Sequence, residues 1–108
     1  MRLQKTNQLD ILRQSYWLTI KILFIEDNPA DALLVKKLLG KITTEKFELV
    51  ETELIEAGLN YLKKGDFDLV LLDLSLPDSW GLNSVKEVKH IAPKIPIIVL
   101  TGIEERVN

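Results

Sequence analysis

The chain has 108 residues, a formal net charge of −2 and no cysteine. This length holds one domain at most, and the slightly acidic balance offers no basic excess to neutralise nucleic-acid phosphates. The lack of cysteine excludes disulfides, thiolate nucleophiles and cysteine metal sites, and it fits a reducing cytoplasm. No apolar run approaches the roughly 20 residues needed to span a bilayer, and the N-terminus lacks the apolar centre of a signal peptide. We therefore expect a cytoplasmic domain with neither a membrane nor a nucleic-acid partner.

Residues 1–19 precede the first strongly patterned segment. Leu9, Leu12 and Tyr16 could share one face of a helix, with polar residues around them. We interpret this region as an N-terminal extension or a linker from an upstream domain. The alternative is a helix that packs on the domain, which is expected over residues 20–108.

The first half of the patterned region predicts a strand, a helix and a second strand. Ile22–Ile25 is apolar at every position and too short for a helix, which is typical of a strand buried on both faces. Pro29–Leu39 predicts a helix, because Asp27 and Asn28 offer a cap, proline suits the first turn and a glycine follows. Phe47–Glu51 is more polar and predicts an edge strand.

The second half repeats this alternation. A helical stripe over residues 55–62 precedes the apolar run Leu69–Leu72. A second stripe over Leu82–Ile91 precedes the apolar run Ile97–Leu100. Such alternation implies right-handed crossovers and an α/β fold, a doubly wound parallel sheet with helices on both faces. In sheets of this kind, ligands bind at the carboxyl ends of the strands.

Acidic residues stand at the expected carboxyl ends of two strands. Glu26 and Asp27 directly follow the first apolar run, and Asp73 precedes a loop that turns through proline and glycine. Thr101 follows a third strand. A carboxylate at the mouth of a buried strand needs solvent, a metal or a partner. Carboxylate oxygens suit Mg²⁺ or Mn²⁺, and together with phosphate oxygens they make a plausible phosphoryl-transfer site.

Within this group, the positions suggest different roles. Asp73 stands alone on the central strand beside the loop, so we expect it to be a nucleophile that becomes an aspartyl phosphate. Glu26 and Asp27 are adjacent on a neighbouring strand and are better metal ligands. Taken singly, each acid could merely end a strand or cap a helix, as Asp27 could for the helix at Pro29. Together with Thr101, they favour a site.

The same residues resemble the receiver domain of two-component response regulators. The matching blocks are Ile25-Glu26-Asp27-Asn28, then Asp73-Leu74-Ser75-Leu76-Pro77 with Gly81, and Ile98-Val99-Leu100-Thr101-Gly102. The spacing Asp-x-x-x-Pro-x-x-x-Gly is specific, and all three blocks occur in the family's order. The resemblance covers residues 21 to about 105. It implies a flavodoxin-like sheet with the strand order 2-1-3-4, in which Phe47–Glu51 is the edge strand.

The resemblance also implies the chemistry of the site. Asp73 would accept a phosphoryl group from a phosphohistidine of a histidine kinase or a phosphotransfer protein. Mg²⁺ would be held by Glu26, Asp27, Asp73 and the backbone carbonyl of Ser75. Thr101 would bond a phosphoryl oxygen and so register the charge. Such a domain is a signalling phosphoacceptor rather than an enzyme, with slow self-dephosphorylation at most.

The sequence departs from the family after Thr101, where it continues for only seven residues. A receiver continues with a fourth helix, a fifth strand that carries a lysine, and a fifth helix. We therefore expect residues 20–108 to be a receiver that lacks this C-terminal portion. Ile97–Leu100 would then be an apolar edge strand, which invites pairing with a second copy of the chain. The alternative expectation is that residues 1–19 cover the apolar sheet face that the missing C-terminal portion would leave exposed.

Two other functions stay open. The missing lysine favours a receiver-like interaction module that is not phosphorylated. A Mg²⁺-dependent phosphohydrolase would need a general acid near Asp73, and Ser75 rather than a second acid stands two residues on. Asp78 is interpreted as a loop or helix-cap residue, and His90 as a solvated surface residue.

Overall fold

The computed structural model describes residues 19–100. In chain order, the elements are β1 (Thr19–Ile25), α2 (Pro29–Gly40), β2 (Lys46–Thr52), α3 (Ile55–Lys64), β3 (Leu69–Asp73), β4 (Ser75–Leu76), β5 (Ser79–Trp80), α4 (Leu82–Ile91) and β6 (Ile97–Leu100). β1 begins at Thr19, the last residue of the predicted extension at residues 1–19. The rest of that extension, residues 1–18, lies outside the described part. Within residues 19–100, no helix combines the length and apolarity needed to cross a bilayer.

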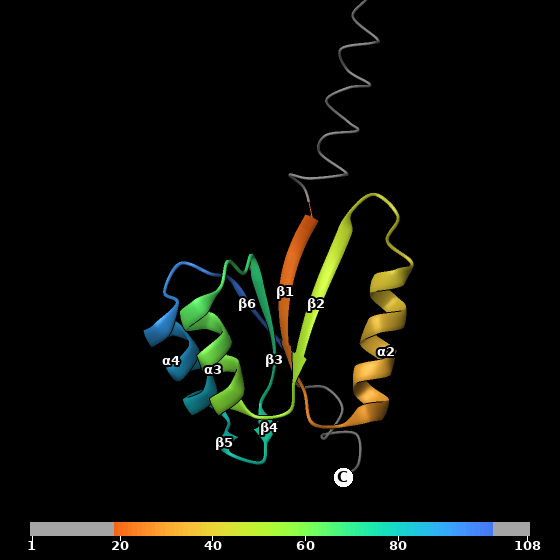
Figure 1. The fold of residues 1–108 in the computed structure, drawn as a ribbon. Coiled ribbons are helices and arrows are strands. Elements are labelled where there is room, and N and C mark those ends of the chain that lie inside the picture. Colours follow the sequence, from red (N-terminus) through yellow and green to blue (C-terminus); the bar gives the residue numbers. More distant parts are fainter. Residues whose placement is uncertain (1–18, 101–108) are drawn as a thin grey trace, which may run out of the picture.

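The main sheet has four parallel strands in the order β2-β1-β3-β6. α2 covers one face, and α3 and α4 cover the other (Figure 1). This arrangement confirms the predicted doubly wound, flavodoxin-like α/β fold. The predicted strand order 2-1-3-4 is confirmed too, because β6 is the fourth strand of the main sheet in chain order. It also confirms the more polar second strand as an edge of the sheet.

The core is divided between the two faces of the sheet. In β1, Leu23 and Ile25 pack among residues of α3 and α4, whereas Ile22 and Phe24 pack with Ala32 of α2. All four β1 side chains are at most 1% exposed. Continuous apolarity therefore indicated burial on both faces, as the sequence predicted.

The start of α2 follows the predicted capping pattern. Oδ1 of Asn28 accepts hydrogen bonds from the backbone amides of Ala30 at 2.9 Å and Asp31 at 3.2 Å. Pro29 is the first helical residue, where its missing amide hydrogen costs nothing. Asn28 rather than Asp27 is thus the cap, which leaves the Asp27 carboxylate available to the site.

Two glycines fix the connections near the site. Gly81 has a positive φ of 62° and precedes α4, and its amide donates to the carbonyl of Leu74 at 2.8 Å. This bond closes the short antiparallel hairpin β4–β5, which the sequence did not predict. Gly58 lets α3 approach β1 closely, because a Cβ there would lie 2.5 Å from Cδ1 of Ile25.

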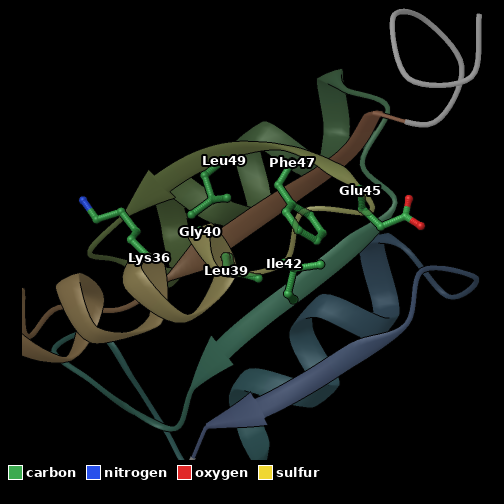
Figure 2. Close-up of a pocket in the computed structure, with 7 residues that line it drawn as sticks. All are labelled: Lys36, Leu39, Gly40, Ile42, Glu45, Phe47 and Leu49. Carbon is green, nitrogen blue, oxygen red and sulfur yellow. The ribbon is translucent and has the colours of Figure 1, made fainter. Parts of the chain in front are cut away.

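Apolar surface remains open at two places. Among residues 19–100, β6 pairs with β3 alone, and its Ile98 side chain is 49% exposed. On the other side, a cavity of about 400 Å³ lies between the end of α2 and β2; Figure 2 shows Phe47 pointing towards Ile42 there. Its lining residues are Lys36, Leu39, Gly40, Ile42, Glu45, Phe47 and Leu49.

Candidate functional site

The carboxyl ends of β1 and β3 bring the predicted acids together. These strands are parallel neighbours, with Ile25 opposite Leu72, so Glu26 and Asp73 follow at the same level of the sheet. The amide of Glu26 donates to the carbonyl of Thr52 at 3.0 Å, which extends the pairing with β2 beyond the end of β1. The backbone at Glu26 is thus fixed by its neighbouring strand.

Glu26, Asp27 and Asp73 form one cluster. One carboxylate oxygen from each residue lies within 4.8 Å of the other two. Asp73 is 4% exposed and Glu26 is 8% exposed, while Asp27 is half-buried. The structure therefore gathers all three predicted acids at a largely buried position, where like charges repel strongly.

Burial within this cluster raises the pKa of Glu26 from 4.5 to about 7. Burial of the carboxylate is the main cause, and the charge of Asp73, a hydrogen bond with Asp73 and the charge of Asp31 raise the pKa further. The backbone amide of Asn28 opposes these effects by donating to Oε2 of Glu26 at 3.2 Å. Glu26 is therefore more readily protonated than an ordinary glutamate, and a bound cation would favour its ionised form.

The donor set fits a small divalent cation. Mg²⁺ prefers oxygen ligands at about 2.1 Å in octahedral geometry, so its ligand oxygens lie about 3 to 4 Å apart. Small side-chain rotations would bring the three carboxylate oxygens from within 4.8 Å to this spacing. An ion there would also relieve the repulsion that raises the pKa of Glu26.

A cavity of about 240 Å³ opens beside Glu26 and Asp27. At this cavity, Nζ of Lys36 forms an ion pair with Oε2 of Glu51 at 3.2 Å. The sequence does not point to Lys36, because nothing in the pattern of α2 distinguishes it from the neighbouring Lys37. Among residues 19–100, the lining consists of Glu26, Asp27, Pro29, Ala32, Lys36, Glu51, Thr52 and Glu53.

The structure describes some of the remaining predicted residues and not others. Ser75 begins β4, two residues after Asp73, and the role of its carbonyl stays a prediction. Thr101 lies outside the described residues, although Leu100, the last residue of β6, pairs with Asp73. Asp78 caps a helix, as the sequence allowed, and His90 is exposed as expected.

Comparison with known proteins gives a consistent result. The family model of the response regulator receiver domain matches residues 22–108. The cell cycle response regulator CtrA of Brucella ovis is 35% identical over 92 residues, which make up 82% of this chain and 38% of that protein. The chain thus spans about two fifths of the length of this relative.

Solved structures share the fold. The phosphorylated cyanobacterial phytochrome response regulator RcpA is 32% identical, with a TM-score of 0.67 over 82% of this chain and 69% of that chain. The response regulator TrrA of Thermotoga maritima, solved in complex with Mg²⁺-BeF, is 28% identical, with a TM-score of 0.68 over 83% of this chain and 76% of that chain.

Proposed function

Because the chain belongs to the response regulator receiver domain family, we propose that it is the phosphoacceptor of a two-component phosphorelay and that Asp73 accepts the phosphoryl group. One observation carries the choice of residue. Asp73 ends the central strand β3 within a cluster of three carboxylates, beside the loop that opens towards α4. Receiver domains are signalling domains rather than enzymes of metabolism, so the proposed product is a phosphorylated form of this chain.

Mg²⁺ is the proposed cofactor, and Mn²⁺ would fit the same ligands. Glu26, Asp27 and Asp73 would hold the ion, together with the backbone carbonyl of Ser75. The oxygen-only donor set and the raised pKa of Glu26 support this assignment. When bound, the ion would offset the negative charge of the incoming phosphoryl group.

The transfer itself requires little from the protein beyond position and charge. A carboxylate oxygen of Asp73 would attack the phosphorus atom of a phosphohistidine, forming an acyl phosphate as the P–N bond breaks. The histidine ring would leave as neutral imidazole, since its other nitrogen carries a proton. Glu26 would have to lose its proton for the cluster to hold the cation, and Thr101 would then bond a phosphoryl oxygen.

The proposed partner is a histidine kinase or a phosphotransfer protein in the cytoplasm. We further propose that residues 20–108 form the receiver unit, with the preceding residues as an extension or linker. The formal net charge of −2 supports a domain that does not itself bind nucleic acid.

Labelling with a small phosphodonor tests the proposal. With Mg²⁺, the chain should gain a stable phosphoryl label that resists acid and is lost in base. Asp73→Asn should abolish the label, because it removes the nucleophilic oxygen. Asp66→Asn is the matched control: Asp66 is an exposed acid in the loop before β3, and its loss should leave labelling unchanged.

The same assay separates the alternative functions. A chain that binds Mg²⁺ but takes no label would be a receiver-like interaction module. Steady consumption of the phosphodonor without accumulation of label would indicate a Mg²⁺-dependent phosphohydrolase. Either result would contradict the proposed function.

A further inference from the structure

Asp78 lies outside the acidic cluster and makes a separate set of contacts. It stands at the turn of the β4–β5 hairpin, and its carboxylate accepts hydrogen bonds from the first two amides of α3. Oδ1 accepts from Ile55 at 2.8 Å, and Oδ2 accepts from Glu56 at 3.0 Å. The residue before α3 is Leu54, whose side chain has no atom that could cap the helix. Asp78 therefore supplies, from a distant part of the sequence, the acceptor that the start of α3 needs.

The start of α3 is linked in turn to the Glu26 side of the cluster. Oγ1 of Thr52 donates to the carbonyl of Leu54 at 3.1 Å. The carbonyl of Thr52 accepts the amide of Glu26 at 3.0 Å. A short chain of hydrogen bonds therefore runs from the backbone of Glu26 through the end of β2 to the start of α3.

The β4–β5 hairpin connects the start of α3 to the segment that follows Asp73. The bond from Gly81 to Leu74 closes the hairpin directly after Asp73. Ser79 is fixed to α4, because its hydroxyl accepts from Ser84 at 2.7 Å and donates to Glu87 at 2.9 Å. The hairpin is thus anchored to α4 by Ser79 and to α3 by Asp78.

We propose that Asp78 is a positioning residue for the metal and phosphoryl site. By tying the hairpin after Asp73 to the first turn of α3, it keeps Asp73 close enough to Glu26 and Asp27 for small side-chain rotations to reach the spacing that a divalent cation requires. This inference rests on the proposed function. Because coupling between two sites is reciprocal, a cation bound at the cluster should also stabilise the first turn of α3.

Mg²⁺ binding by Asp78 variants of the full chain tests the inference. Asp78→Ala removes both acceptors and should weaken Mg²⁺ affinity, measured by calorimetric titration, by roughly threefold to tenfold. Asp78→Asn keeps one acceptor oxygen and should give an intermediate affinity. Asp78 is exposed, so neither substitution opens a cavity in the core.

Amide exchange measured by NMR gives a second readout. In the wild-type chain, Mg²⁺ should slow exchange at the amides of Ile55 and Glu56, which donate to Asp78. In Asp78→Ala this response to Mg²⁺ should vanish, even though α3 still forms. If Asp78 only stabilised the helix, Asp78→Ala would change amide exchange in α3 by the same factor with and without Mg²⁺.

Asn60→Gly is the matched control. Asn60 is an exposed residue inside α3, so this substitution lowers helix stability without touching the hairpin. It should lower the melting temperature much as Asp78→Ala does, and leave Mg²⁺ affinity unchanged. Wild-type affinity in Asp78→Ala, or equal weakening in Asn60→Gly, would overturn the positioning role alone. A wild-type chain that does not bind Mg²⁺ would overturn the proposed function as well.

Discussion

At the scale of single residues, Glu26 links the fold to the chemistry. Its carboxyl is nearly buried beside Asp73, and one backbone amide only partly compensates for the lost hydration. The raised pKa of about 7 is the measure of that imbalance. Burial therefore favours a protonated Glu26, whereas the proposed cation would require the carboxylate.

The stability of the metal-free chain should consequently depend on pH through Glu26. Its pKa in the folded state, about 7, exceeds its ordinary value of 4.5, so folding is favoured when Glu26 is protonated. This contribution is fully present below about pH 4.5 and is lost as the pH rises through about 7. Relative to Glu26→Gln, the wild-type chain should lose on the order of 1 kcal/mol between pH 5 and pH 8, measured by urea unfolding.

Saturating Mg²⁺ should reverse this trend, since the ion binds the ionised carboxylate. Glu26→Gln serves as the control because it keeps the size of the side chain and cannot titrate. Parallel pH profiles of the two chains without Mg²⁺ would contradict the assignment of the raised pKa to Glu26.

At the scale of elements, the close contact of α3 with β1 depends on Gly58. A Cβ at this position would lie 2.5 Å from Cδ1 and 3.2 Å from Cγ1 of Ile25, a fully buried residue next to Glu26. The contact therefore determines both core packing and the position of the strand end that carries the site.

Gly58→Ala should destabilise the chain by about 1 kcal/mol, because overpacking against Ile25 outweighs the gain in helix propensity. Gly58→Val should cost more. Gly40→Ala is the control, since Gly40 is also a helical glycine, the last residue of α2, but a Cβ there meets nothing within 4 Å. Urea unfolding of the three variants measures the difference, and equal stability of the Gly58 and Gly40 alanine variants would contradict the packing argument.

The sequence predicted the elements that are long enough to carry a recognisable burial pattern. The apolar runs at Ile22–Ile25 and Leu69–Leu72 gave the central strands, and the acids that follow them gave the cluster, because parallel strands end at one edge. The β4–β5 hairpin escaped prediction because two-residue strands have no periodicity. The partners of Asp78 also escaped, because its cap joins residues 22 and 23 positions away.

At the scale of the whole molecule, the sheet formed by residues 19–100 has one more polar and one more apolar edge. In β2 only charged residues are exposed and the apolar residues are partly buried, whereas β6 leaves Ile98 and Val99 49% and 37% exposed. Unpaired backbone groups along an apolar edge are a template for another strand. We propose that two copies of this chain associate through β6.

Sedimentation of the 108-residue chain tests this association. The wild-type chain should show a concentration-dependent dimer, and Ile98→Lys should shift it towards monomer, because a charge on an edge strand opposes pairing. Leu34→Lys is the control: Leu34 is a 50% exposed residue of α2 and should leave the dimer intact. A wild-type chain that remains monomeric, or a dimer lost only in Leu34→Lys, would contradict pairing through β6.

The order of the sheet also sets the order in which the chain can fold during its synthesis. β1 is made first, yet it lies in the middle, between β2 and β3. A growing chain that ends at Lys64 can pair β1 with β2, but Ile22–Ile25 still lacks its second neighbour until Leu69–Asp73 emerges. During that interval the most apolar strand is open along one side and prone to aggregation. Once Leu69–Asp73 has emerged, the strand that carries Asp73 also covers this open side of β1.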